Sequence, residues 1–150
     1  MKIYFSGSIR GGRQYKEIYQ TLINHLRKYG QVLSEHVGNP SLTSKGENLP
    51  KEYIYRRDMS MIRESDVFIA EVSSPSHSVG YEIRDMEILG KNHLLLFHLN
   101  NDYNLTGMFS GNQNLNVKRY NTIEDAKKHI DKFFTKLKQN RKIDKAPEDI

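Results

Sequence analysis

The sequence predicts an α/β protein of three layers, in which helices cover both faces of a doubly wound parallel sheet of about five strands. Three observations lead to this prediction. Short apolar runs alternate along the chain with helical stretches, as in strand–helix–strand units. Two of the runs, residues 67–72 and 93–99, are apolar almost throughout, which is typical of parallel strands buried on both faces. The links between the runs are mostly short, which favours one compact domain.

The first strand, residues 2–6, leads into a loop that is rich in glycine: Gly7, Gly11 and Gly12. Glycine lets the backbone approach a ligand closely, while Ser8 and Arg10 offer a hydroxyl and a forked cationic donor. The glycines lack the G-x-G-x-x-G spacing and no Gly-Lys-Ser/Thr follows, which excludes the dinucleotide and Walker motifs. An anion site at the mouth of a helix and an ordinary strand-to-helix turn both fit this pattern, and Ser8 with Arg10 favours the anion site.

The next stretch predicts a helix and then a short strand. Residues 14–29 carry apolar side chains at helical spacing, namely Ile18, Leu22, Ile23 and Leu26. We expect Gly30 to close this helix in the C′ position. Residues 31–37 indicate a strand parallel to the first, and its end would bring His36 to the same edge as the glycine loop. His36 is therefore either a ligand contact or a plain histidine of the surface or core.

Residues 38–49 form a polar loop, long enough to act as a lid, before a helix predicted from Pro50 to Glu64. Its inward face is defined by Ile54, Tyr55, Met59, Met61 and Ile62. Asp58 falls inside this apolar stripe. A carboxylate is costly there unless something pairs with it, so we expect Asp58 to be locked to a partner or used in chemistry.

The strand over residues 67–72 ends in a polar turn at 73–78, which precedes a helix predicted over 79–89. Glu82 lies on the side of this helix that also carries Val79, Met86 and Leu89. One interpretation is that Glu82 complements the helix dipole. The capping-box spacing of three residues is not met from Ser78, however, so a second acid on an apolar face remains to be explained.

The rest of the chain adds two strands and a long helix. A strand over 93–99 is followed by an Asn- and Gly-rich loop over 100–116 with apolar anchors, and a fifth strand over 117–120. The anchors are Leu105, Met108 and Phe109. An amphipathic helix is predicted from residue 123 to about 139, and residues 140–150 read as a disordered basic tail. Residues 1–139 would thus form a single domain.

Composition narrows the function classes. Most of the net charge of +5 lies in residues 117–150, which hold 10 Lys/Arg against 6 Asp/Glu. The sequence shows no basic groove with interleaved aromatic residues. We therefore do not expect the protein to bind nucleic-acid polymers. Zero cysteines exclude thiol catalysis, disulfides and Cys-based metal sites. No apolar run approaches the roughly 20 residues of a membrane span. We expect a soluble cytoplasmic protein, or a nuclear one in a eukaryote.

Several motifs occur in one order: Tyr4-Phe-Ser-Gly-Ser-Ile-Arg-Gly-Gly12, Ser34-Glu-His-Val37, Asp58 in its helix, Ala70-Glu-Val72, and Pro75-Ser76 with Val79-Gly-Tyr-Glu82. With these motifs, residues 2–120 resemble the 2′-deoxynucleoside 5′-phosphate N-hydrolases, a branch of the nucleoside 2-deoxyribosyltransferase superfamily. The resemblance implies a flavodoxin-like sheet, as periodicity does. It also implies a homodimer in which the loop over residues 105–116 completes the neighbour's site.

The resemblance implies roles for individual residues. Glu82 would be the nucleophile that attacks the sugar C1′, Asp58 the acid that protonates the departing base, and Tyr4 the residue that orients the nucleophile. The remaining contacts implied for the nucleotide are Ser8, Ile9, Arg10, Gly12, Ser76 and Gly80 for phosphate and sugar, His36 for the base, and Met108, Asn112, Asn114 or Asn116 from the partner. His77-Ser78 replaces the family's usual Leu-Gly at the pocket rim.

The implied reaction is hydrolysis of the N-glycosidic bond of 2′-deoxynucleoside 5′-monophosphates through a covalent glycosyl-Glu82 intermediate. A base anion leaves poorly, so an acid must protonate it while a carboxylate captures the oxocarbenium-like sugar, and no metal or redox cofactor is required. A deoxyribosyltransferase would use the same intermediate, but a free nucleoside gives Arg10 no anion to bind. A non-catalytic nucleotide sensor would not need the two acids.

Overall fold

The computed structural model describes residues 1–99 and 104–143. One sheet of five parallel strands runs in the order β2-β1-β3-β4-β5. The strands are β1 (Lys2–Ser6), β2 (Gln31–Val32), β3 (Val67–Glu71), β4 (Asn92–His98) and β5 (Val117–Tyr120). This is the flavodoxin-like order, so the predicted fold class is confirmed.

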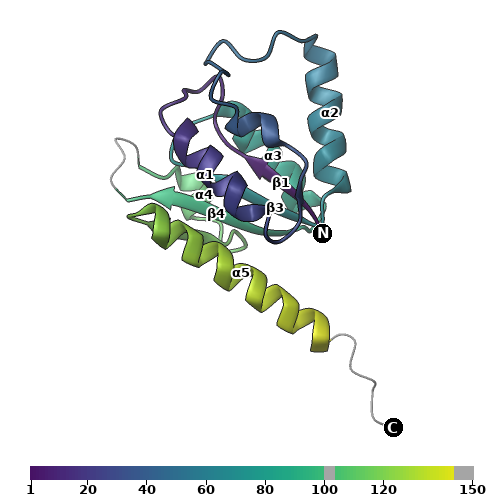
Figure 1. Ribbon diagram of the computed structural model, residues 1–150, viewed down its shortest axis with the longest axis vertical. Helices are drawn as coiled ribbons and strands as arrows, with labels where there is room; N and C mark the ends of the chain where they lie inside the picture. Colours follow the sequence, from purple (N-terminus) through teal and green to yellow (C-terminus); the bar gives the residue numbers. More distant parts are fainter. Residues whose placement is uncertain (100–103, 144–150) are drawn as a thin grey trace.

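Helices cover both faces of the sheet, as Figure 1 shows. They are α1 (Lys16–Leu26), the 3₁₀ turn η1 (Glu35–Gly38), α2 (Lys51–Glu64), α3 (His77–Ile88), the short α4 (Gly107–Ser110) and α5 (Ile123–Ile143). Helices α1 and α5 pack on one face, and α2 and α3 on the other. Among the described residues, no helix combines the length and the hydrophobicity that crossing a bilayer requires.

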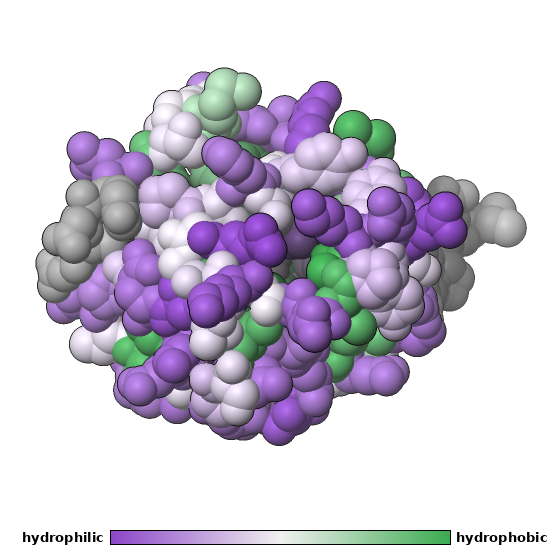
Figure 2. Space-filling view, turned by 90° about the horizontal axis from the view of Figure 1, so that it is seen from above, coloured by the Kyte–Doolittle hydropathy of each residue, from purple (hydrophilic) through white to green (hydrophobic). Residues whose placement is uncertain are grey.

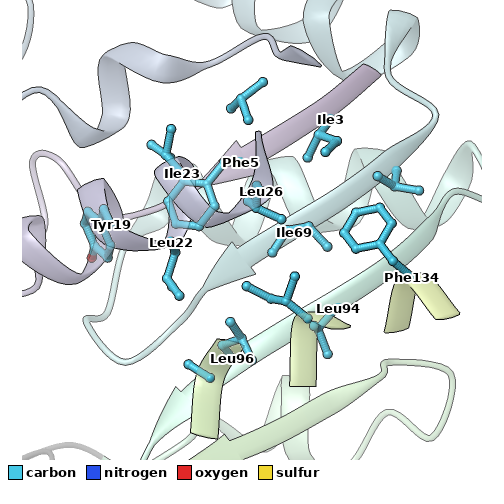
Figure 3. Packing of buried hydrophobic residues seen from close by; sticks show 14 of the residues in the cluster. Ile3, Phe5, Tyr19, Leu22, Ile23, Leu26, Ile69, Leu94, Leu96 and Phe134 are labelled. Atoms are coloured by element: carbon cyan, nitrogen blue, oxygen red, sulfur yellow. The ribbon is translucent and has the colours of Figure 1, made fainter. Parts of the chain in front are cut away.

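The core lies in two apolar clusters, one on each side of the sheet, because neighbouring strand residues point to opposite faces. On the α1–α5 face, Phe5 and Ile69 pack with residues such as Leu22, Leu26 and Phe134, all at most 1% exposed (Figure 3). Burial of such side chains, worth roughly 1.5–3 kcal/mol each, is the main force that fixes the helices on the sheet.

On the other face, Tyr4 stacks on Phe68, with ring centroids 5.5 Å apart. Helices α2 and α3 cover these rings with their apolar side chains: Met59, Ile62, Val79, Ile83 and Met86. Tyr4 therefore points to the side of the sheet from which α2 and α3 present their acids.

The strand predicted over residues 31–37 is wrong beyond Val32. The Ser34 hydroxyl accepts from the Phe5 backbone N–H at 2.8 Å and donates to the Phe5 carbonyl at 2.7 Å. A side chain thus takes over the backbone groups that a longer β2 would have paired. The chain then turns into η1, which places His36 in a 3₁₀ turn rather than at a strand end.

The prediction for Gly30 is also wrong. Helix α1 already ends at Leu26, and the residue that follows it, Arg27, has a right-handed conformation. Gly30 is not among the glycines with positive φ, which in the described residues are Gly12, Gly46 and Gly90. Gly30 is needed for close approach instead, because a Cβ there would lie 2.1 Å from the Met1 carbonyl oxygen.

The other helices differ from prediction at their ends and in part of their faces. Tyr55 and Leu89, expected on inward faces, are 52% and 43% exposed. Helix α3 starts at His77, since the Ser76 hydroxyl caps it by accepting from Val79 N–H. Helix α5 extends to Ile143, past the predicted end at 139. The disorder predicted for residues 140–150 is therefore wrong for 140–143, which continue the helix, and residues 144–150 lie outside the described residues.

Candidate active site

Six of the predicted site residues line one pocket of about 700 Å³ beside the end of β1: Tyr4, Ile9, Arg10, His36, Asp58 and Glu82. Strand β1 lies between β2 and β3, where the strand order reverses, and open α/β sheets bind ligands at such a point. The loop between η1 and α2 crosses above this region in Figure 1 and supplies a further wall, residues 45–49. Seen from above in Figure 2, this face is mostly hydrophilic, with hydrophobic residues in separate patches.

Glu82 is held by groups from β1. The Ser6 hydroxyl donates to Glu82 Oε2 at 2.5 Å. The pKa of Glu82 is raised to about 7: burial has the largest effect and the negative charge of Asp58 adds to it, whereas hydrogen bonds from Ser6 and Tyr4 and the charge of Arg57 oppose the shift. A carboxyl group with this pKa exchanges its proton near neutral pH, as residues of catalytic sites often do.

Tyr4 is 1% exposed, and its hydroxyl interacts with Glu82. Burial, together with the charges of Glu82 and Asp58, raises the pKa of Tyr4 well above its usual value. The phenol therefore stays protonated and serves as a donor to the carboxylate.

Asp58 is bound to its neighbour on α2. Arg57 Nε donates to Asp58 Oδ1 at 2.8 Å, and the two side chains are 17% and 15% exposed. Of the two alternatives predicted for Asp58, a partner or a role in chemistry, the structure thus shows the partner. The helix itself supplies this partner, since Arg57 directly precedes Asp58.

Arg57 also joins Glu47 and His36 to this group. Its Nη1 and Nη2 donate to the two carboxylate oxygens of Glu47 at 2.8 and 2.6 Å, and Nη2 lies 3.2 Å from His36 Nε2. Burial, and then the charge of Arg57, lowers the pKa of His36. The hydrogen bonds from Arg57 lower the pKa of Glu47. One guanidinium therefore serves two carboxyl groups and a histidine along this wall of the pocket.

The glycine loop packs against the turn that precedes α3. A Cβ on Gly11 would lie 2.1 Å from the Pro75 carbonyl oxygen, and Gly12 has φ of 129°. Ser8 is fully buried, and its Oγ has no hydrogen-bond partner among the described residues. Arg10 is exposed and donates to the Lys45 carbonyl at 3.0 Å. The loop thus places a cation at one end of the pocket, while its unpartnered hydroxyl is buried and does not line the pocket.

The other predicted site residues lie elsewhere in the chain. Ser76, Gly80 and Met108 line a second pocket of about 560 Å³, between the start of α3 and α4. Asn114 and Asn116 line a third pocket with the starts of β4 and β5, at the opposite edge of the sheet. A single chain does not bring these residues to the pocket of Glu82.

Sequence reasoning missed Ser6, Glu47 and Arg57. Ser6 could have been found as the polar residue that ends an apolar strand next to the glycine loop. Arg57 directly precedes Asp58, but its direction depends on which side of the helix faces the pocket. Glu47 lies in a loop without periodicity, where no pattern predicts side-chain direction.

Comparison with known proteins gives the family. The sequence pattern of the family described as "Nucleoside 2-deoxyribosyltransferase" matches residues 3–127. The chain belongs to this family. The segment that matches the family contains every predicted site residue and all five strands except Lys2, the first residue of β1. Among the described residues, no cluster of three or more His, Asp or Glu is suited to a metal ion.

Relatives and solved structures agree with the family. The chain is 45% identical over 114 residues to the 5-hydroxymethyl-dUMP N-hydrolase of Esox lucius, covering 74% of this chain and 79% of that protein. It is 42% identical to a Trichoplax adhaerens protein provisionally named 2′-deoxynucleoside 5′-phosphate N-hydrolase 1, over 89% and 92% of the two chains. A CMP N-glycosidase of Clostridium botulinum shares the fold, with a TM-score of 0.61, 21% identity and coverage of 87% and 99%.

Proposed function

We propose that this chain hydrolyses the N-glycosidic bond of 2′-deoxynucleoside 5′-monophosphates and releases the free base and 2-deoxyribose 5-phosphate. The observation that carries the proposal is that one pocket joins Glu82, Asp58 and Arg10. Two carboxyl groups are what glycoside cleavage requires, and a guanidinium suits a phosphate. The names of the relatives point to the same chemistry.

In the proposed mechanism, the Glu82 carboxylate attacks the sugar C1′ while Asp58 gives a proton to the departing base. The bond from C1′ to the base nitrogen breaks, and an ester between C1′ and Glu82 forms. Water then attacks C1′ and gives a proton to Asp58, while the bond from C1′ to Glu82 breaks. Tyr4 orients Glu82 through its hydroxyl. Without a 2′-hydroxyl the oxocarbenium-like transition state forms more readily, so the reaction needs no cofactor.

The glycine loop is proposed to bind the phosphate and the sugar. Arg10 would exchange the Lys45 carbonyl for a phosphate oxygen, and the unpartnered hydroxyl of Ser8 offers a further donor. Ile9 and Gly12 flank these two groups, and Ser76 and Gly80 would contribute from the start of α3. At the other end of the pocket, His36 is proposed to approach the base.

We also propose a homodimer in which the loop over residues 105–116 reaches the neighbour's site. Met108 is 81% exposed, and Tyr81 and Ile88 on α3 are 59% and 69% exposed, which is a large apolar surface for a monomer. The Asn116 amide is already bound to the His93 carbonyl, so Asn114 is the freer partner candidate. Sedimentation as a dimer at micromolar concentration is expected. A fully active monomer would contradict this proposal.

A cytoplasmic location is proposed, or a nuclear one in a eukaryote, because deoxynucleotides are present there. Cell fractionation followed by detection of the protein tests this location. Recovery of the protein in a membrane or extracellular fraction would contradict it.

Chromatography of deoxynucleoside monophosphates after incubation with the protein tests the proposed activity. Free base and deoxyribose 5-phosphate are expected in equal amounts, and Glu82→Ala should form neither while still binding nucleotide. If unphosphorylated nucleosides released their base with the same kcat/KM as the monophosphates, the result would argue for a deoxyribosyltransferase. Transfer of the deoxyribosyl group to an added second base would argue for the same enzyme. Nucleotide that binds but stays intact over a long incubation would indicate a sensor.

A further inference from the structure

Arg57 has an unusual position beside the proposed general acid. Its guanidinium contacts residues from three separate segments: Asp58 on its own helix, Glu47 in the loop before α2, and His36 in η1. All four side chains are only 15–22% exposed. The ring of Tyr53 lies 5.8 Å from the Arg57 Cζ on a further side. The forked shape of the side chain is what allows one cation to serve several partners.

We propose that Arg57 is a positioning residue of the site: it fixes the Asp58 side chain before the nucleotide binds, and ties it through Glu47 to the loop over residues 39–50. This inference rests on the proposed function. Asp58 can protonate a base only after it has exchanged Arg57 for the base and taken up a proton. Arg57 therefore controls when Asp58 becomes an acid.

The electrostatics of the two acids support this role. The reaction needs one proton on the pair, on Asp58, with Glu82 ionised. In the structure Asp58 contacts a cation, whereas the raised pKa of Glu82 favours the proton on Glu82. Binding of the nucleotide must move the proton from Glu82 to Asp58, which leaves the charge of the pair unchanged. Arg57 sets the balance between these two arrangements.

The loop is coupled to the same guanidinium. Glu47 binds it with both carboxylate oxygens, and this bidentate pair is partly buried. Arg13 and Arg10 fasten the same loop through the carbonyls of Leu42 and Lys45. Since Arg10 is also the proposed phosphate ligand, nucleotide binding would alter the loop contacts at both ends of the pocket.

Removal of Arg57 should shift the pH dependence of the reaction. The titratable groups that contact Arg57 directly are His36, Glu47 and Asp58. Tyr4 and Glu82 lie around them in the pocket, and the charge of Arg13 acts on His36 from further away. The positive charge of Arg57 lowers the pKa of Glu82. Without it, Glu82 ionises at higher pH, so the acidic limb of the kcat/KM profile, which reports the free enzyme, moves to higher pH.

The test compares Arg57→Gln with two matched variants. Arg56→Gln removes the same charge from the next, exposed position of α2. Glu47→Gln breaks the loop contact but leaves the bond from Arg57 to Asp58. For each variant, kcat and KM for a deoxynucleoside monophosphate are measured from pH 5 to 9, and the rate of trypsin cleavage after Lys45 reports on the loop.

Arg57→Gln is expected to lower kcat, because Asp58 loses the contact that positions it, and to move the acidic limb of the kcat/KM profile by about half a pH unit or more toward alkaline pH. Arg56→Gln should keep the wild-type profile. Trypsin cleavage should accelerate by about tenfold in both Arg57→Gln and Glu47→Gln, the effect of losing a charge-assisted contact. Only Arg57→Gln should combine both effects.

A wild-type kcat together with an unmoved acidic limb in Arg57→Gln would overturn the role of Arg57 at the two acids, and wild-type cleavage in Glu47→Gln would overturn the coupling to the loop. If Arg56→Gln shifted the pH profile equally, the loss of any positive charge from α2 would explain the shift, and the inference would be contradicted. If the wild-type protein released no base at all, the proposed function itself would fail, and the trypsin result would still test the contact between Arg57 and the loop.

Discussion

Two hydroxyl groups of β1 control the Glu82 carboxylate. Ser6 and Tyr4 both lower the pKa of Glu82 against the effect of burial, and Ser6 has the larger effect. Ser6→Ala should therefore raise this pKa by about one unit, because a charge-assisted hydrogen bond is worth roughly 1.5–3 kcal/mol. The acidic limb of kcat/KM should move to higher pH by that amount. Ser60→Ala, at an exposed position of α2, is the control, and an unmoved limb in Ser6→Ala would contradict this reading.

For single residues, the sequence predicts which side chains belong to the site better than it predicts what those side chains contact. An acid inside an apolar helical stripe is costly, and this reasoning led to Asp58 and Glu82, which line the same pocket. The partners of these acids could not be predicted in the same way. Whether Arg57 turns toward Asp58 or toward solvent depends on side-chain rotamers and on a loop that carries Glu47, and neither leaves a periodic signal.

Among the elements, the glycine loop is the one on which substrate choice depends. Arg10→Ala should lower kcat/KM for a deoxynucleoside monophosphate by about 10- to 100-fold, because one charge-assisted contact to the phosphate is lost. It should leave kcat/KM for the unphosphorylated nucleoside unchanged. Steady-state assays of both substrates measure this preference, with Lys16→Ala as a charge control. A parallel loss on both substrates would place Arg10 outside the phosphate site.

The short β2 shows why element boundaries were predicted less well than elements. Residues 31–37 have the apolar pattern of a strand, yet the Ser34 hydroxyl binds both backbone groups of Phe5 and ends the pairing. Ser34→Ala leaves this buried N–H and carbonyl without partners and should lower the free energy of unfolding by about 1–3 kcal/mol. Denaturant titration measures it, with the exposed Ser41→Ala as control. An unchanged midpoint would show that the hydroxyl is dispensable.

For the molecule as a whole, the stability of the protein should fall as the pH rises from about 4.5 to about 7 and then level off. The pKa of Glu82 is about 7 in the folded chain, against an ordinary value of 4.5. Its ionisation is therefore harder in the folded state, so its cost is absent below about pH 4.5, grows between pH 4.5 and 7, and stays at its full value above about pH 7. Glu82→Gln should be more stable than the wild type by about 2–3 kcal/mol at pH 8.5, with little difference at pH 4. Thermal unfolding at the two pH values measures this.

Glu71 adds to the same trend, because its pKa is also about 7, raised by burial. It is fully buried at the end of β3 and accepts hydrogen bonds from Tyr120 and Ser73. A wild-type protein that is equally stable at pH 5 and pH 8.5 would contradict both pKa values.

The architecture was the most predictable feature. Nearly continuous apolar runs predicted β3 and β4 within one or two residues, because strands buried on both faces leave a strong signal. The placement of Ser76, Gly80 and Met108 in a second pocket could not be predicted, since it depends on how α3 and α4 pack. Assembly lies beyond a single chain, and the sedimentation experiment tests it.

The configuration of the sugar in the product tests the central claim most directly. A deoxynucleoside monophosphate is incubated with the protein in the presence of methanol, which competes with water for C1′ and gives a stable methyl glycoside. Attack by Glu82 followed by attack by methanol inverts C1′ twice, so proton NMR should show methyl 2-deoxyribofuranoside 5-phosphate with the β configuration of the substrate. The α anomer, or no cleavage at all, would contradict the account.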